Sequence, residues 1–437
     1  MKSANAKNLL LASILATFVV GCGGGSSDSG STTPEIPVAP TTPAKIFGSV
    51  EAVSTTNQTI TVNGYTLQTA GTPINYEDNI LELADLTPGV QVEVETLKGK
   101  AIDIELNPAI AGVVSEVQGN KLVVNGTTFT FSALNSDIQV GSWVMISALQ
   151  QNDGTWSVSS VNQAPVLTHA EIEGRISLLD TTASKFNIGS MQVEYSNATI
   201  EYGDILKNGQ WVEVDGNFEN SHFVAAKIDV ENDTDYDGVE IEGTITWVNS
   251  ELSYFEIDNR TKIQVTANTK FEDGVKTDLK SGNQVDVDMA NSSSGLVATN
   301  IDFENQQPEI PVTQAREFSN QGFATLNSGI VTINGTEFVI DAATHFDDGL
   351  TEAMLNNIWI EVEGIEVKAT ALTPAHWLIK EIERETKETE ISLEGPVSNN
   401  SLWNYTSSDN SLAQFDGKWV EVECMLNGDD LLNCRLD

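Results

Sequence analysis

The sequence predicts an all-β protein, a tandem array of about six small OB-like or SH3-like β-barrels behind an N-terminal signal segment and a flexible tether. Three observations predict this architecture. Two short motifs recur six times in the same order, and the first of them returns every 62 to 79 residues. Hydrophobic residues between the motifs alternate with period two, which is typical of strands. About five strands fit into each interval, as in a small closed or partly open barrel.

The charge balance excludes one broad class of partner. Lys and Arg number 22 against 63 Asp and Glu, which gives a formal net charge of −41. A chain this acidic cannot neutralise phosphates, so we expect no binding to nucleic acid. With 40% hydrophobic residues, the chain is too apolar for a disordered acidic tail and too polar for a multi-span membrane protein.

Residues 1–21 have the order of a lipoprotein signal peptide, with a basic start and an apolar stretch too short to span a bilayer. The stretch ends in Val-Val-Gly-Cys, which resembles a bacterial lipobox. The resemblance implies cleavage before Cys22 and a diacylglycerol thioether on its sulfur. Residues 22–44, rich in Gly, Ser and Pro, predict a tether. Because Gly23 follows the cysteine, the resemblance implies a lipid anchor in the outer membrane; an ordinary signal peptide with an incidental cysteine is the alternative.

The first motif is a strand with a central glycine, of the form Ile-x-Gly-x-Ile or Ile-x-Gly-x-Val. Its copies are centred on Gly48, Gly112, Gly174 and Gly243, with weaker copies around Gly322 and Gly395. The second motif is Gly-x-Trp-Val-x-Val or a close variant, and its copies begin at Gly89, Gly141, Gly209, Gly282, Asn357 and Gly417. Six ordered pairs of two motifs indicate a true repeat.

Each repeat contains further strand and turn signals. Asn-Gly pairs predict two-residue hairpins of type I′ at residues 63–64, 125–126 and 334–335. Stretches such as 76–86 or 350–356 then predict one short helix or turn. The strand of the second motif follows, and a last strand completes the unit.

The motifs divide the chain into six barrel repeats. We predict their bounds as 45–108, 109–164, 169–232, 239–304, 317–385 and 389–437, with a linker over 305–316. The sixth repeat is expected to be truncated. The second repeat lacks an acidic motif found in other units, and the sixth has Gly395-Pro396 in its first strand. Both are therefore interpreted as divergent caps or degenerate units.

That acidic motif is Thr-x-Phe-Glu/Asp-Asp-Gly, at residues 269–274 and 344–349. Together with the central-glycine strand, the Asn-Gly hairpin, the second motif and a final Ala-x-x-Ile strand, it resembles the bacterial family called domain of unknown function 5666. The resemblance covers roughly residues 45–437. It implies a tandem array of the kind found in envelope lipoproteins, and no activity comes with it.

Four tryptophans occupy one repeat position: Trp143, Trp211, Trp359 and Trp419. Strand alternation places Trp211 on the face opposite Val212 and Val214, so it does not lie on the obvious core face. One hypothesis is an aromatic surface that stacks sugar rings or binds a partner protein. The other, which we favour, is that each tryptophan packs beneath a loop or against the next repeat, because Trp usually buries its ring.

Asp233, Asp235 and Asp237, followed by Gly238, match the first half of a calcium loop. The glutamate expected at position 12 is replaced by Thr244. A Ca²⁺ ion that stiffens the joint between the third and fourth repeats is therefore one hypothesis, and a solvated acidic turn is the favoured alternative. We expect no other cofactor.

The sequence predicts no catalytic residues. It contains no Gly-x-Ser-x-Gly elbow, phosphate loop or His-Glu-x-x-His helix. The four histidines fall at unrelated places in their repeats and therefore predict no metal set: His169, His222, His345 and His376. We expect that the protein is not an enzyme.

Cys424 and Cys434 are the two cysteines other than Cys22, and an oxidising envelope favours a disulfide between them. They flank a turn that we centre at Asp429. This centring places residue 426 opposite 432 and the two cysteines opposite each other, within reach of a bridge.

These observations predict a non-enzymatic cell-envelope lipoprotein, a scaffold or binding module of repeated small barrels whose ligand is unknown. Its partners would be the membrane, through the lipid on Cys22, and an envelope protein or glycan. The alternative is an extracellular glycan-binding protein, or an accessory to a polysaccharide-active enzyme. Glycan binding that depends on Trp211 and Trp359 would favour the alternative.

Overall fold

The structure is a computed structural model of the whole chain. It describes residues 42–436 except for 78, 152–153, 165–166, 203–204, 232–235, 237, 294, 305–314 and 371. Cys22 and the three aspartates of the predicted calcium loop lie outside the described residues. The described part is built of β-strands and short 3-10 helices and contains no α-helix. None of its helices has the length and apolar character needed to cross a membrane.

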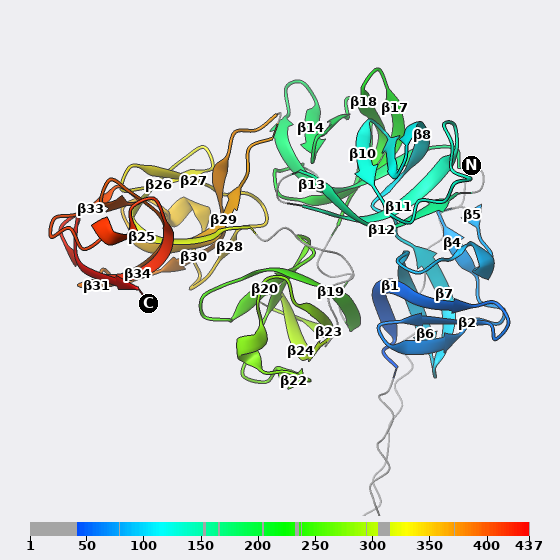
Figure 1. The fold of residues 1–437 in the computed structure, drawn as a ribbon, viewed down its shortest axis with the longest axis horizontal. Helices are drawn as coiled ribbons and strands as arrows, with labels where there is room; N and C mark the ends of the chain where they lie inside the picture. The colour runs from blue at the N-terminus through cyan, green and yellow to red at the C-terminus, as the bar shows by residue number, and fades with distance from the viewer. Residues whose placement is uncertain are drawn as a thin grey trace, which may run out of the picture. The chain divides into compact units, whose positions relative to one another are not determined.

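The fifth repeat shows the barrel most completely (yellow to orange in Figure 1). Its strands are β25 (Glu317–Asn327), β26 (Ile330–Ile333), β27 (Thr336–Val339), β29 (Trp359–Val367) and β30 (His376–Arg384). The hydrogen-bonded order is β25-β26-β27-β30-β29, and β29 pairs again with β25, which closes the barrel. Among these five pairings, the one between β27 and β30 is parallel. This five-stranded Greek-key order is that of an OB-like barrel, which decides between the two predicted barrel types.

The other repeats have the same five strands, and in all but the second the third strand pairs in parallel with the last, as β27 does with β30. In the second repeat the third strand pairs with the second strand alone among the described residues. In the first repeat they are β1 (Lys45–Ser54), β2 (Thr59–Val62), β3 (Tyr65–Gln68), β6 (Gln91–Leu97) and β7 (Lys100–Leu106). In the second they are β8 (Ile110–Gln118), β9 (Lys121–Val124), β10 (Thr127–Thr130), β11 (Trp143–Gln150) and β12 (Trp156–Gln163). In the third they are β13 (Ala170–Asp180), β14 (Lys185–Ile188), β15 (Met191–Glu194), β17 (Trp211–Glu219) and β18 (His222–Val230). In the fourth they are β19 (Val239–Val248), β20 (Tyr254–Ile257), β21 (Thr261–Gln264), β23 (Gln284–Ser292) and β24 (Gly295–Phe303).

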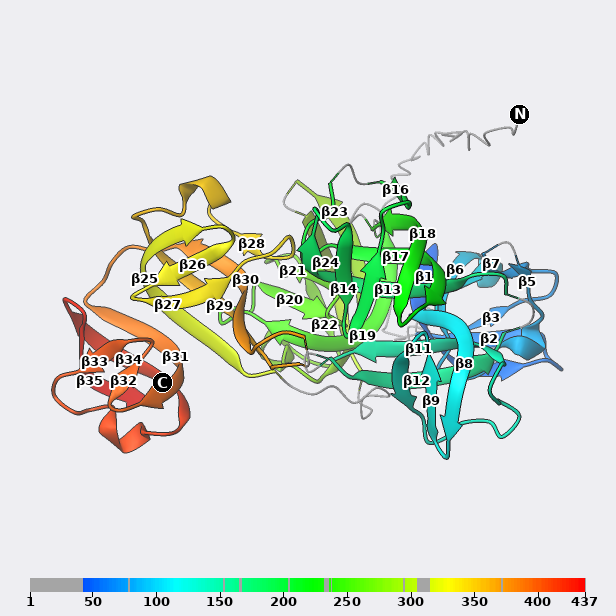
Figure 2. The ribbon, with the colours of Figure 1, turned by 90° about the horizontal axis from the view of Figure 1, so that it is seen from above.

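The sixth repeat has a complete set of five strands, although the sequence predicts a truncated unit (orange to red in Figure 2). They are β31 (Glu390–Ser398), β32 (Ser401–Leu402), β33 (Tyr405–Ser407), β34 (Trp419–Asn427) and β35 (Asp430–Leu436). The repeat is short because β32 and β33 have two and three residues and its connections are tight. The sixth repeat is therefore shorter than the others but keeps the five-strand topology.

Small extra strands distinguish the repeats that carry an additional segment before the second motif. They are β4 (Ile74–Tyr76) and β5 (Asn79–Ile80) in the first repeat, β16 (Thr199–Glu201), β22 (Lys270–Glu272) and β28 (His345–Phe346). In the described parts of the second and sixth repeats no such strand is present.

The register explains why the first motif needs its glycine. Each central glycine lies opposite the aliphatic residue that follows the tryptophan position, in the pairs Gly48–Val92, Gly112–Val144, Gly174–Val212, Gly243–Val285, Gly322–Ile360 and Gly395–Val420. A Cβ atom on Gly243 would collide with Ile257, and one on Gly322 with Ile333, both from the neighbouring hairpin strand. The glycine therefore lets the hairpin pack over the first strand of its barrel.

The second motif begins with glycine because of its backbone conformation. At this position five glycines have φ between 77° and 96°, a left-handed conformation that side chains disfavour. The fifth repeat has Asn357 there instead, with φ 58°, and Asn tolerates this region better than most residues. The predicted Asn-Gly turns are confirmed in the same way, because both residues of all three pairs have positive φ, as a type I′ turn requires. The 3-10 helices Leu83–Asp85 and Glu352–Met354 lie within the predicted helix-or-turn stretches.

The barrels do not stand alone, because their first strands pair with one another. β1 of the first repeat pairs in parallel with β19 of the fourth. Two further pairings are antiparallel: β8 of the second repeat pairs with β13 of the third, and β25 of the fifth pairs with β31 of the sixth. The described strands consequently form three sheets, each shared by two repeats. Buried valines and isoleucines of the motifs fill the barrel interiors, and the cores of the paired fifth and sixth repeats are continuous.

Candidate functional site

The four tryptophans of the repeated position lie at joints between strands and repeats and do not form one surface. Trp143 packs against the cores of the first and second repeats. Trp419 of the sixth repeat donates a hydrogen bond from Nε1 to the carbonyl of Glu317, 3.0 Å away in the fifth repeat. Trp359 is only 7% exposed, so its ring face is not available for stacking. This placement corresponds to the packing interpretation that the sequence favours.

Trp211 leads to a group of charged residues that the sequence does not reveal. Its Nε1 donates to Glu173 Oε1 at 2.6 Å. The guanidinium groups of Arg260 and Arg175 lie 5.1 and 5.9 Å from its ring centroid, within the range of cation–π attraction. We call Arg175, Glu256, Arg260, Lys262 and Lys380 the ionic cluster.

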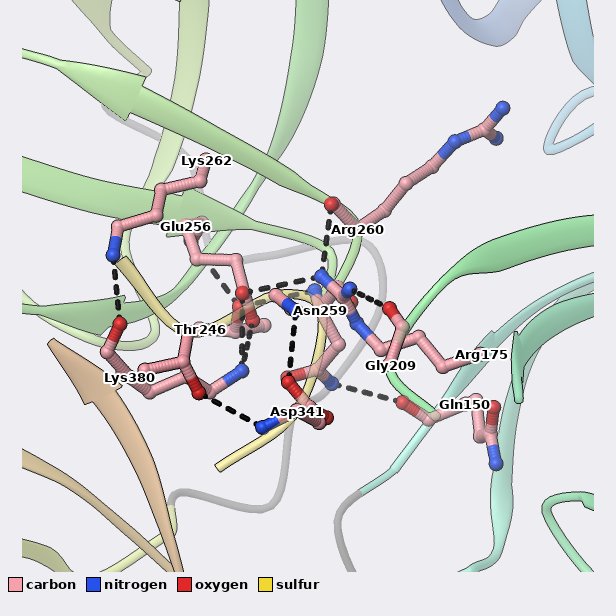
Figure 3. Close-up of polar contacts among 12 residues, drawn as sticks. Gln150, Arg175, Gly209, Thr246, Glu256, Asn259, Arg260, Lys262, Asp341 and Lys380 are labelled. Atoms are coloured by element: carbon pink, nitrogen blue, oxygen red, sulfur yellow. Dashed lines mark hydrogen bonds and ion pairs between the residues drawn. The ribbon is translucent and has the colours of Figure 1, made fainter. Parts of the chain in front are cut away.

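Glu256 accepts the central contacts of the ionic cluster (Figure 3). It lies on β20 and is 1% exposed. Lys380 of β30 donates to its two carboxylate oxygens at 2.7 and 3.0 Å, and Arg175 of β13 donates at 3.2 Å. Burial alone would raise the pKa of Glu256, but the charges of Lys380 and Arg175 hold it below its ordinary value. One glutamate of the fourth repeat therefore binds cations of the fifth and the third.

Arg175 also donates to three backbone carbonyls. Its Nε lies 2.6 Å from Asn259 O, its Nη1 2.8 Å from Gly209 O and its Nη2 2.9 Å from Arg260 O (Figure 3). The side chain of Asn259 continues the network to the second repeat through a hydrogen bond to Gln150 O at 3.0 Å. The planar guanidinium group of Arg175 thus holds two turns in place, one in the third repeat and one in the fourth.

Arg260 of the fourth repeat contacts two glutamates of the third repeat, Glu173 and Glu231. Its Nη1 lies 3.0 Å from Glu173 Oε1, and it also forms a two-donor contact with the carboxylate of Glu231. Burial would raise the pKa of Glu231, but Arg260 lowers it. Burial raises the pKa of Glu173 to about 8, because its effect outweighs the attraction of Arg260.

Lys262 is the least strongly paired cation of the ionic cluster. Its Nζ donates to the carbonyl of Lys380 at 2.9 Å and lies 5.0 Å from the ring of Trp247 and 5.3 Å from that of Tyr254. Burial lowers the pKa of this amine to about 8. Lys262 is therefore partly neutral near physiological pH.

Two hollows border the ionic cluster. The polar cavity has a volume of about 290 Å³, and its wall includes four residues of the cluster together with Trp211, Tyr236, Tyr254 and His345. The apolar cleft has a volume of about 440 Å³ and lies between the third and fifth repeats. Most of its surface is apolar, and aliphatic residues of its lining are Ile176, Leu178, Val339, Ile340, Ile365 and Val367. Polar residues also line it, among them Gln150, Arg175, Asn208, Asp341 and Lys380.

A group of carboxylates elsewhere is already partnered. One oxygen from each of four residues lies within 4.8 Å of the others: Glu77, Glu171, Glu213 and Asp215. The hydroxyl of Tyr76 donates to Glu171, and His169 lies 3.5 Å from Asp215. Burial raises the pKa of Glu171, and that of Glu213 to about 8. Protonation and these partners lower the charge of the group, so we assign no metal to it.

A disulfide joins Cys424 and Cys434, as the sequence predicts, with Cα atoms 4.2 Å apart. The predicted register of the hairpin is wrong by one residue at the turn, because Leu426 pairs with Leu431 and not with residue 432. The turn consists of two residues, and a bulge next to the cysteines takes up the difference. Asn433, with φ 54°, is the extra residue that restores the contact of the two sulfurs.

The sequence contains one weak signal for the ionic cluster. Arg260 follows Asp258-Asn259 in the hairpin of the fourth repeat, where three other repeats have Asn-Gly. A cation in a tight turn of a very acidic chain is unusual. Glu256 and Lys380 carry no such signal, since both occupy strand positions at which a polar residue is ordinary.

The comparison with protein families gives one match. The family described as Domain of unknown function (DUF5666) matches residues 47–100, 111–161, 173–229, 242–302 and 324–373, together more than half of the chain. A search of curated proteins found no match.

Proposed function

The chain belongs to the family described as Domain of unknown function (DUF5666), and from this premise we propose that it is a non-enzymatic cell-envelope lipoprotein whose barrels form a binding scaffold. The repeated fold fits a scaffold or binding module. The ionic cluster is the observation that carries the proposal. Its charged groups form ion pairs between residues of different repeats. Glu256 forms ion pairs with Lys380 and Arg175, and Arg260 forms ion pairs with Glu173 and Glu231.

Such an arrangement suits a structural joint better than a reaction centre. A general acid or base needs a proton that it can exchange with a substrate, whereas these groups are committed to one another. Their removal from water is costly unless each partner stays in place, which favours one fixed packing of the third, fourth and fifth repeats.

The apolar cleft is the surface that this joint offers to a ligand. Its volume of about 440 Å³ is in the range of small-molecule sites, and most of its surface is apolar. Leu178, at its rim, is 47% exposed. We propose an uncharged and largely apolar ligand group for this cleft, because most of the surface that would contact it is apolar.

An environment-sensitive apolar dye such as Nile red tests this binding. The full chain should enhance the fluorescence of the dye, and Leu178→Ser should weaken dye binding severalfold. Leu97→Ser is the matched control, because Leu97 is 58% exposed in the first repeat and does not line the cleft. Equal dye binding by both variants would contradict the proposal, as would binding to a glycan array that depends on Trp211.

We also propose that a lipid on Cys22 anchors the scaffold to the outer membrane. The basic start, the apolar stretch and the Val-Val-Gly-Cys sequence before a Gly/Ser/Pro tether support it. Two or more acyl chains give the stable anchoring that one chain cannot. Mass spectrometry of the protein from its own cells should find an acylated N-terminal cysteine, and Cys22→Ser should move the protein to the soluble fraction. An unmodified Cys22 would contradict the anchor.

A further inference from the structure

Three side chains of ligand type meet in the fifth repeat. β28 runs parallel to β30, and His345 lies beside Glu381 in their register. Asp347 is two residues beyond His345 and therefore points to the same side of the extended chain. One nitrogen or oxygen atom from each of His345, Asp347 and Glu381 lies within 4.8 Å of the other two.

Buried polar atoms of this group have no hydrogen-bond partner among the described residues. Glu381 is 1% exposed, and both of its carboxylate oxygens are buried and unpaired, as is Nε2 of His345. The amide of Asn249 is close enough to favour the charged form of Glu381 but does not reach hydrogen-bond geometry. A buried carboxylate without a partner is expensive. The described residues therefore supply no hydrogen-bond partner for the carboxylate of Glu381 or for Nε2 of His345.

The equivalent positions of other repeats are filled differently. In the third repeat the register places Thr199, Glu201 and Lys227 at the positions of His345, Asp347 and Glu381. There the two charges neutralise each other, with Lys227 Nζ 3.7 Å from Glu201. In the first repeat the corresponding polar pair is Asn75 and Asp103, joined by a hydrogen bond of 3.4 Å.

The fourth repeat has the same acidic motif but a different set at these positions. Lys270, Glu272 and Asn300 replace the imidazole and the two carboxylates. Among the repeats whose register is described, the fifth is thus the one that combines a histidine with two carboxylates. Two positions thus differ in kind: Lys270 stands where the fifth repeat has His345, and Asn300 where it has Glu381.

We propose that His345, Asp347 and Glu381 bind one divalent transition-metal ion, with zinc as the best fit. One imidazole and two carboxylates form a donor set that Zn²⁺ accepts, and three protein ligands leave a position for a fourth. His345 also lines the polar cavity, which gives that position access to water. Ligand atoms of a tetrahedral zinc site lie about 3.3–3.6 Å apart, so small side-chain rotations suffice to close the site.

The metal would hold β28 against β30 within the fifth repeat, at the place where this repeat contacts the fourth. The ring of His345 packs on Tyr254 of the fourth repeat with centroids 4.2 Å apart, and the ligands come from β28, β30 and the turn between β28 and β29. Lys262 is the nearby cation whose charge acts on both His345 and Glu381. Its amine competes with a metal for Glu381, so its removal should tighten metal binding.

The test uses the full chain, treated with EDTA, freed of chelator and titrated with Zn²⁺ in a calorimeter. His345→Gln and Glu381→Gln should each remove one bound zinc or weaken its affinity more than tenfold, and Lys262→Met should tighten it. His376→Gln is the matched control, because this histidine of the same repeat bonds to the carbonyl of Pro374 and is not one of the three proposed ligands. His169→Gln controls for zinc at the partnered carboxylates beside Asp215.

The outcomes separate the site from background binding. A loss of zinc in the His345 and Glu381 variants with full retention in the two control variants would support the site. Equal zinc binding by wild type and His345→Gln, or a loss in the control variants instead, would overturn it. Circular dichroism checks folding, and if Glu381→Gln is unfolded, Asp347→Asn replaces it. The dye experiment on the apolar cleft is independent, so either proposal can fail alone.

Discussion

Lys380 of the fifth repeat lies with its ammonium 2.7 Å from a carboxylate oxygen of Glu256 in the fourth, and both side chains are at least 95% buried. The two residues are 124 positions apart in the chain. Their contact therefore depends on the packing of whole barrels. It is the clearest sign that the repeats are parts of one structure and not independent units on a string.

Breaking this pair should destabilise the protein strongly. Glu256→Gln leaves the buried charges of Lys380 and Arg175 without a counter-charge, and we expect a loss of about 3–5 kcal/mol in the free energy of unfolding. Urea denaturation measures it. Glu93→Gln is the matched control, because the Lys45–Glu93 pair is partly exposed and should be worth about 1 kcal/mol or less. Similar effects of the two substitutions would contradict a structural role of the ionic cluster.

Stability should fall as the pH rises from about 5 to about 8. Burial, with the repulsion of neighbouring carboxylates, raises the pKa of Glu317, Glu361 and Glu394 to about 7 each. In this window the native state binds more protons than the unfolded chain, so deprotonation costs free energy of folding. Melting midpoints in the presence of EDTA measure the effect.

The lowered pKa of Glu256 acts in another range. Its contribution to stability is lost only when the pH falls through that lowered value, which lies below the ordinary range of a glutamate. Glu394→Gln should flatten the decline between about pH 5 and 8, since it removes one of the carboxyl groups that titrate in this range. A midpoint that rises over the same range would contradict the raised pKa values of these carboxylates.

Loss of the disulfide should destabilise the sixth repeat. The bridge closes a short loop, so replacing Cys424 and Cys434 by Ala should cost about 2–3 kcal/mol. The bridge itself is checked by intact mass, which should increase by two hydrogens on reduction. No mass change in protein from its own compartment would contradict the bridge and weaken the assignment to an oxidising environment.

Calcium should raise the melting midpoint if Asp233, Asp235 and Asp237 hold the ion, because a ligand of the native state alone stabilises it. Asp235→Asn should then remove the increase. An unchanged midpoint of the wild type at millimolar calcium would exclude the site. Zinc binding at His345 is a separate measurement, and Asp235→Asn should leave it intact.

The features predicted from the sequence are those encoded locally. The Asn-Gly turns, the glycine positions and the buried valines each follow from a few neighbouring residues, which is why they agree with the structure. The predicted register of the last hairpin is wrong by one residue because a bulge at Asn433 is not distinguishable from an ordinary strand residue. A period-two pattern predicts regular strand pairing, so it does not predict the bulge at Asn433 that brings the two cysteines opposite each other.

The charged residues of the joint could not be predicted from alternation. Glu256 alternates with the core residues Phe255 and Ile257, and in a single barrel its side chain would face water. It is buried because another repeat covers that face. His345 could not be identified from the repeats, because the histidines recur at no fixed position. Its neighbour Glu381 lies on the parallel strand, so the adjacent sequence does not reveal the pair either. Both cases depend on contacts between distant segments.

The parallel pairing of β1 with β19 makes the first barrel depend on the fourth. Residues 45–47 of β1 pair with β6 on one side and with β19 on the other. Without the fourth repeat, that second side would present unpaired backbone groups, and such edges recruit other strands. A fragment that ends after three repeats would therefore be prone to aggregate, whereas the fourth repeat protects the first in the full chain.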